Sequence, residues 1–240
     1  MRPMAIRKLI VLLVFLVGHS FVMAQEWDFL TWHDMKVNRF LTKNLSASIE
    51  QQLRLENNST RVDQTFTELG LKYNLPKGFK AAVAYRLSWV ANKDRYFEDR
   101  HRYIVDLSYG KTIWRLKPEL RARFQHRPSV SAFSESAKPE ESSILVRLKF
   151  GISYTELKDW KPGVEFEAFI RTNDSRMNGF IAYRYRLFLD YDLPKRQNLG
   201  LFYMVETDYS GSHPLFTSVV GVNYSYEWKK AKKTKEKEKE

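Results

Sequence analysis

The stretch WRLKPELRARFQHRP, residues 114–128, alternates between two kinds of side chain. Its odd positions from 115 to 127 carry charged or amide groups, whereas its even positions include Trp114, Leu120 and Phe124. Period-2 alternation is typical of a β-strand, because successive side chains point to opposite faces. The stretch therefore predicts a strand with one apolar face and one charged face. Pro118 within it predicts a bulge or a local break near the start of the strand, because proline cannot donate to a ladder.

The same alternation recurs through most of the chain. Most of the segments have about ten residues or more, whereas strands of globular proteins average about 5–6 and tilted membrane strands need about 9–11. The pattern predicts an all-β fold, a single antiparallel transmembrane β-barrel of about ten strands, with twelve as the alternative. The ten expected strands cover residues 45–56, 63–75, 79–90, 100–111, 114–127, 142–154, 163–171, 180–191, 198–209 and 216–228.

Four segments divide the chain. Residues 1–24 have a basic start, an apolar run and a small residue at Ala24, which is typical of a signal peptide. An uncleaved anchor is the alternative. Residues 25–44 form an N-terminal segment expected in the periplasm or the lumen, because an eleventh crossing would break the even strand count of bacterial barrels. Two short strands hidden there would give twelve. Residues 45–228 form the barrel, and residues 229–240 a charged disordered tail.

The connections between the expected strands alternate between short turns and longer polar loops. Outer-membrane barrels have short periplasmic turns and longer external loops. We therefore expect both chain ends in the periplasm of a two-membrane bacterium.

Composition sets limits on the partners. The net charge is +12, of which the signal peptide contributes +3 and the tail +4, so the barrel itself is only modestly basic. We therefore expect no nucleic-acid partner. There are 0 cysteines, so strand pairing and packing must stabilise the fold without disulfides. The oligomeric state stays open.

The two faces of the strands predict two surroundings. The apolar face carries almost no charge at mid-strand, as in Ile144, Val146 and Leu148, which suits contact with lipid, and aromatic residues gather near the strand ends as interfacial girdles. A soluble periplasmic lipid-binding barrel is the alternative. The opposite face predicts a lumenal charge network of near-balanced sign, formed by Glu50, Arg54, Glu68, Arg86, Arg102, Asp106, Glu119, Arg121, Arg123, Arg147, Glu165, Glu167, Arg184, Arg186 and Glu206.

Inward-phase residues such as Phe66, Ile104 and Phe202 would fill much of the remaining space. Open aqueous channels appear at roughly 16–18 strands, so we expect no wide pore. A structural, binding or narrow solute-passage role fits a charged, largely filled lumen.

Four stretches, residues 32–54, 66–89, 97–109 and 183–206, resemble an uncharacterised family of bacterial outer-membrane proteins of unknown function. The resemblance implies a small outer-membrane barrel and no assigned activity. The aromatic-rich strand that ends at Trp228 resembles the terminal signal recognised by barrel-assembly machinery. Outer-membrane lipid, lipopolysaccharide and that machinery are the expected partners.

Enzymatic activity has little support in the sequence, although a lipid A deacylase or phospholipase is the alternative function. Such an enzyme needs a base within reach of a serine. His126 lies three residues before Ser129, and His213 lies near Ser210 and Ser212, but neither pair matches a strand-borne dyad. No histidine pair at i, i+2 and no cysteine supplies a zinc ligand set. We therefore expect no catalytic residue, metal or cofactor.

Overall fold

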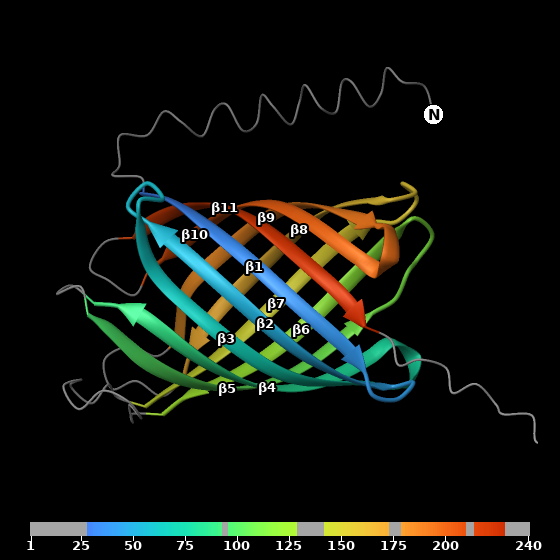
Figure 1. The fold of residues 1–240 in the computed structure, drawn as a ribbon, viewed down its shortest axis with the longest axis horizontal. Helices are drawn as coiled ribbons and strands as arrows, with labels where there is room; N and C mark the ends of the chain where they lie inside the picture. The colour runs from blue at the N-terminus through green and yellow to red at the C-terminus, as the bar shows by residue number, and fades with distance from the viewer. Residues whose placement is uncertain (1–27, 93–95, 129–141, 173–178, 210–213, 229–240) are drawn as a thin grey trace, which may run out of the picture.

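The computed structural model describes residues 28–92, 96–128, 142–172, 179–209 and 214–228. These residues form eleven strands that close into one barrel (Figure 1). The expected all-β barrel is confirmed. The strands are β1 (Asp28–Phe40), β2 (Leu45–Glu56), β3 (Arg61–Asn74), β4 (Phe79–Ala91), β5 (Phe97–Gly110), β6 (Leu116–Arg127), β7 (Ser143–Tyr154), β8 (Trp160–Arg171), β9 (Gly179–Leu193), β10 (Gln197–Asp208) and β11 (Leu215–Trp228).

Two single-turn 3-10 helices, η2 (Pro76–Gly78) and η3 (Pro194–Arg196), join strands. Within each, a lysine takes a positive φ of 60°, Lys77 in η2 and Lys195 in η3. Across the described residues, no helix is long and apolar enough to cross a membrane.

The barrel is closed by a parallel pair of strands. Consecutive strands pair antiparallel from β1 to β11, whereas β1 and β11 pair in parallel, from Asp28 opposite Thr217 to Arg39 opposite Trp228. Strands of an antiparallel meander alternate in direction, so the first and last of an odd number point the same way. One parallel contact is therefore required.

Strand β1 corrects the expectation for residues 25–44. We expected that segment in the periplasm or the lumen beside about ten strands, but residues 28–40 form a full strand, and the count is eleven. Asp34 and Lys36 lie on the inward phase and Met35 on the outward phase, so the alternation continues through β1. The physical reason is edge pairing: without β1, the facing edges of β2 and β11 would leave rows of backbone groups unpaired.

The two rims of the barrel differ. Residues 41–44, 75–78, 111–115, 155–159 and 194–196 connect strands at one end, which we call the turn rim, and residues 57–60 lie at the opposite end, the loop rim. Because β1 and β11 are parallel, Asp28 lies at the loop rim and Trp228 at the turn rim (Figure 1). The described part of the chain therefore enters the barrel at one rim and leaves it at the other. The chain ends, which we expected in the periplasm, lie outside the described residues.

Two prolines lie where ladders stop at the turn rim. Pro118 pairs with Ile152 of β7, but it has no partner in β5, because the ladder between β5 and β6 stops at the neighbouring residue, Glu119. Pro162 is likewise opposite Leu189 of β9, while the ladder between β7 and β8 ends at Gly163. The missing N–H therefore lies just outside a ladder. At Pro118 the register shows the end of one ladder and no bulge.

The outer wall is apolar. Large hydrophobic side chains project from the middle of the strands, with Met35 58%, Leu69 53%, Val105 53% and Leu120 54% exposed. Exposed aromatic residues lie near both rims: Tyr73, Phe79, Trp114, Trp160 and Trp228 near the turn rim, and Phe97, Phe180 and Tyr209 near the loop rim. An exposed apolar surface of this extent, interrupted at Gln51, Thr65 and Thr67, marks contact with a partner or a membrane.

The inner wall is polar and partly filled by large side chains. Phe66 is 0% exposed, and Trp32, Phe202, Met204 and Val219 form a buried cluster. Phe202 packs onto a glycine of β11: a Cβ atom added at Gly221 would fall 2.1 Å from Phe202 Cζ. The absence of a side chain at Gly221 therefore leaves room for the tip of this ring.

Candidate functional site in the barrel lumen

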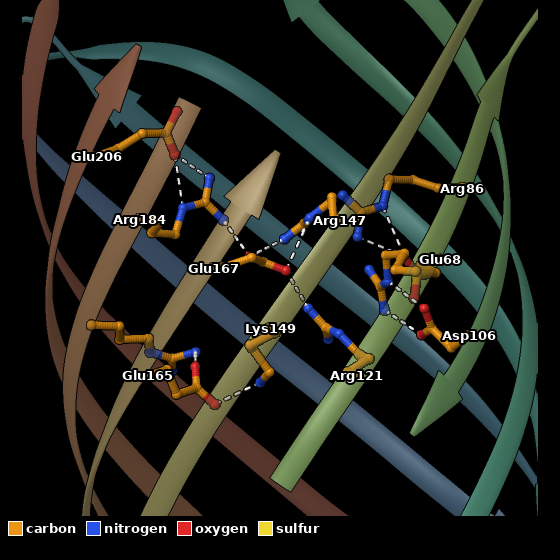
Figure 2. Close-up of polar contacts among 12 residues, drawn as sticks. Glu68, Arg86, Asp106, Arg121, Arg147, Lys149, Glu165, Glu167, Arg184 and Glu206 are labelled. Atoms are coloured by element: carbon orange, nitrogen blue, oxygen red, sulfur yellow. Dashed lines mark hydrogen bonds and ion pairs between the residues drawn. The ribbon is translucent and has the colours of Figure 1, made fainter. Parts of the chain in front are cut away.

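Glu167 of β8 is the centre of the lumenal charge network (Figure 2). It accepts a hydrogen bond of 2.7 Å from Arg121 Nη2 of β6. Arg147 of β7 donates two more, from Nε at 3.1 Å and from Nη2 at 2.6 Å. Arg184 Nη1 of β9 lies 3.6 Å from Glu167 Oε2. Glu167 is only 4% exposed, so three guanidinium groups surround one buried carboxylate.

Arg184 extends this cluster to β10. Its Nε donates to Glu206 Oε2 at 2.7 Å, and its guanidinium lies 4.8 Å from the centre of the Phe169 ring. The register explains the arrangement, because Arg184 is directly opposite both Glu167 on β8 and Glu206 on β10. One arginine therefore joins two carboxylates across three strands.

A second cluster surrounds Glu165, two residues along β8. Lys149 Nζ donates to it at 2.6 Å, and Arg186 Nη1 lies 3.5 Å away. With its amide oriented to match its neighbours, Asn223 of β11 accepts from Arg186 at 2.7 Å and donates to Asp34 of β1 at 2.8 Å. This cluster therefore links β7, β8, β9, β11 and β1.

Two ion pairs join adjacent strands on the opposite side of the lumen. Arg86 of β4 donates to Glu68 of β3 at 2.6 and 2.8 Å, and both side chains are buried. Arg123 of β6 makes a bidentate pair with Asp106 of β5, at 2.7 and 2.6 Å. Each pair is directly opposite in its ladder. Bidentate geometry of this kind fixes side chains as well as neutralising charge.

The other expected network residues differ in their surroundings. Glu50 accepts from Lys36 Nζ at 2.7 Å, whereas Glu119 lies at the turn rim, 3.9 Å from Lys117 and partly exposed. Arg54 donates to Gln52 Oε1, and its guanidinium lies 3.7 Å from the centre of the Trp32 ring. Among the described residues, neither Arg54 nor Arg102 has a carboxylate within ion-pair distance.

The structure adds network members that the sequence did not single out, among them Asp34, Lys36, Lys149, Gln52 and Asn223. Asp34 and Lys36 belong to β1, which was not assigned to the barrel. Lys149 could have been predicted from the alternation, because it lies two residues after Arg147 on the same strand and so points to the same, inward side. The amides Gln52 and Asn223 carried none, since an uncharged polar residue on the inward phase has no evident partner until the register is known.

Three cavities follow one another along the lumen. The turn-side cavity has a volume of about 510 Å³ and includes Lys117 and Ser225 in its wall. The central cavity has about 250 Å³ and shares Glu165 and Arg186 with the first. The loop-side cavity has about 140 Å³ and shares Arg102 and Gln125 with the second. The side chains of the network therefore stand as partitions between successive chambers.

A separate polar cluster lies on the outward phase near the loop rim. His126 Nε2 lies 3.0 Å from Ser142 Oγ, and its ring stacks on Tyr103 with 6.4 Å between ring centres. Nearby on β5, His101 Nε2 lies 3.2 Å from Asp99, and its Nδ1 lies 2.6 Å from Tyr85 OH. In the described part of the chain, Ser142 therefore contacts His126, whereas Asp99 contacts the other histidine, His101. Ser129, Ser210, Ser212 and His213 lie outside the described residues.

The described ranges contain no group of three or more histidine, aspartate or glutamate side chains arranged to hold a metal ion. Glu165 and Glu167, the carboxylates at the centres of the two clusters, instead pair with arginine or lysine. The arrangement can position and neutralise charge and can bind a charged solute.

A family model described as "Protein of unknown function (DUF2490)" matches residues 29–216. The chain belongs to the DUF2490 family. The match covers β1 from its second residue and stops after the first two residues of β11. The search of curated proteins found no match.

Two solved structures resemble the DUF2490 barrel at low sequence identity. One, titled as the NanC porin in a rhombohedral crystal form, has a TM-score of 0.48 and 14% identity over 74% of this chain and 86% of that one. The other, titled as the beta domain of the Bordetella autotransporter BrkA, has a TM-score of 0.44 and 10% identity over 75% of this chain and 82% of that one.

Proposed function

We propose that this protein is an integral barrel of the outer membrane of a two-membrane bacterium, with a narrow, partitioned path for small solutes through its lumen. The apolar outer wall and the aromatic residues at both rims support insertion into a bilayer. The strands have 12 to 15 residues, enough to cross the apolar core when tilted. Outer-membrane lipid would then cover the outward side chains. Barrel-assembly machinery would insert the barrel into the membrane.

The series of three cavities carries the proposal of a narrow path. A structural plug would be packed continuously, whereas this lumen contains chambers of about 510, 250 and 140 Å³ with shared walls. Eleven strands also fall between barrels of about 8 strands, which side chains fill, and porins of about 16–18, which are open. A solute would have to pass one ionic partition at a time.

Planar-bilayer recording of the purified full chain tests this proposal. We expect a small conductance that rises when the partition between the turn-side and central cavities is removed by Glu165→Ala together with Arg186→Ala. The control Glu56→Ala, at the loop rim and outside the walls of all three cavities, should leave the conductance unchanged. A large stable current in the wild type would contradict a narrow path, and so would the absence of any current.

Location is tested separately. Carbonate-resistant recovery in outer membranes and heat-modifiable migration on gels would support an integral barrel. Recovery in the soluble periplasmic fraction would instead support a lipid-binding barrel.

One observation favours a lipid hydrolase as a second candidate. His126 and Ser142 are hydrogen-bonded at 3.0 Å on the outward phase, where membrane lipid would reach them. Within the described residues no carboxylate orients His126. Hydrolysis of phospholipid or lipid A that is lost in both Ser142→Ala and His126→Ala, and kept in Ser143→Ala, would establish this candidate. Equal activity in all variants would exclude this pair.

A further inference from the structure

Two arginines of the central cavity differ from their neighbours. Arg86, Arg147 and Arg184 each have a carboxylate at hydrogen-bond distance. Arg54 and Arg102 border the same cavity, and the described residues supply neither with an ion pair. Arg54 donates to Gln52, which in turn donates to Asp34, and its guanidinium lies over the face of Trp32. No carboxylate among the described residues contacts Arg54 directly. An unpaired charge away from bulk water is costly unless something else compensates it.

Gln125 supplies an independent observation. It is 2% exposed, and neither its Oε1 nor its Nε2 has a hydrogen-bond partner in the described structure. Its side chain lies in the wall of both the central and the loop-side cavities, beside Arg102 in each. Trp32 Nε1 is likewise buried and unpartnered at the central cavity. A buried polar group left without a partner costs about 1–3 kcal/mol, so these groups favour an occupant that accepts hydrogen bonds.

The charge of the wall selects the sign of that occupant. Nine of the residues around the central cavity are arginine or lysine, and four are aspartate or glutamate. Of those four carboxylates, Glu50, Glu165 and Glu167 accept hydrogen bonds from lysine or arginine. Three more carboxylates, Glu68, Asp106 and Glu206, do not line the cavity but pair with arginines that do. Seven carboxylates therefore oppose nine cations, and the surplus of two positive charges corresponds to Arg54 and Arg102.

We propose that the central cavity is a binding site for a small oxyanion, a carboxylate or phosphate group, held by the guanidinium groups of Arg54 and Arg102 and by N–H groups of Gln125 and Trp32. Guanidinium groups match both oxyanions in geometry as well as charge. A volume of about 250 Å³ lies below the range of about 300–1,000 Å³ typical of pockets for drug-sized ligands, which limits the solute to a small one.

The site deepens the proposed function, because a cationic chamber in the path would make the path selective for anions. The claim about selectivity rests on the proposed passage. The claim about binding does not, because a closed lumen could also hold an anion that enters from one rim.

Calorimetric titration of the full chain in detergent with inorganic phosphate tests the site, at low ionic strength because salt screens charge. We expect binding by the wild type, at least tenfold weaker binding by Arg54→Gln with Arg102→Gln, and no change in Arg61→Gln. Arg61 is the matched control, since it pairs with Glu56 at the loop rim, outside the central cavity. Glucose, which is uncharged, should not bind.

Gln125→Leu keeps the inference testable if the double variant fails to fold, because it removes only an unpaired amide. It should fold like the wild type and bind phosphate more weakly. No binding by the wild type, or the same loss in Arg61→Gln, would overturn the site. Phosphate binding by a protein that passes no current would support the site and refute the passage, whereas current without phosphate binding would refute the site alone.

Discussion

Replacing Glu167 by glutamine removes the one negative charge shared by Arg121, Arg147 and Arg184. The glutamine keeps the size of the side chain, but it turns an amide NH₂ toward guanidinium groups that now repel one another. Removing one partner of a buried ion pair costs about 3–5 kcal/mol, and Glu167 is 4% exposed with two arginines at hydrogen-bond distance. Arg184 keeps Glu206 as a partner. We therefore expect a loss near the lower end of that range, about 3 kcal/mol.

The assay is equilibrium refolding from urea into lipid vesicles, followed by tryptophan fluorescence. Glu56→Gln is the matched control, because Glu56 pairs with Arg61 and their side chains are 25% and 53% exposed. An exposed pair contributes about 0–1 kcal/mol. Arg121→Gln combined with Glu167→Gln should be less destabilising than the sum of the two single changes, with a coupling of about 0.5–3 kcal/mol. If Glu167→Gln costs no more than Glu56→Gln, the network does not stabilise the barrel.

Three further outcomes follow from the same structure. Gly221→Ala should destabilise the barrel by about 1–3 kcal/mol in urea, because its Cβ would fall 2.1 Å from Phe202, whereas Gly110→Ala, with its nearest neighbour at 3.5 Å, should be tolerated. Leu148→Arg, at mid-strand on the outer wall, should cost about 2–4 kcal/mol on refolding into lipid, and Leu75→Arg at the turn rim about 0–1; equal costs would contradict lipid contact. An epitope inserted before Asp28 or in residues 57–60 should be reached by antibody on intact cells, whereas one in residues 41–44 should require permeabilised cells; an inaccessible epitope before Asp28 would contradict the parallel closure.

Period-2 alternation together with the length of the segments was sufficient to predict the barrel and the apolar face of its strands. Leu120, Phe124 and Leu148 were assigned to that face without any knowledge of the fold, and they are exposed on the outer wall. The alternation works because a strand in a closed sheet has only two sides. Strand β1 was missed because the rule of even strand number outweighed a local pattern that was present in the sequence.

Partner choice within the lumen required the register. Glu68 and Arg86 are directly opposite on adjacent strands, and once the strands are aligned their pairing follows. Arg121 and Glu167 belong to β6 and β8, which are not neighbours in the barrel. Their contact depends on strand tilt and on side chains that reach past β7, and nothing local in the sequence encodes it. Ser142 was missed beside His126 for a similar reason, since 16 positions separate them.

Cross-linking of β1 to β11 tests the closed eleven-stranded barrel most directly, and the inward and outward assignments depend on that closure. The chain has 0 cysteines, so any cross-link must form between the two cysteines that are introduced. Met35 is opposite Tyr224 in the parallel ladder, at a separation that a disulfide or a short thiol cross-linker can span. We predict efficient cross-linking of Met35→Cys with Tyr224→Cys in isolated membranes, and none of Gln51→Cys with Tyr224→Cys, because β1 separates β2 from β11. Cross-linking of Gln51→Cys with Tyr224→Cys, and none of Met35→Cys with Tyr224→Cys, would show a ten-stranded barrel closed by β2 and β11. That result would contradict the account.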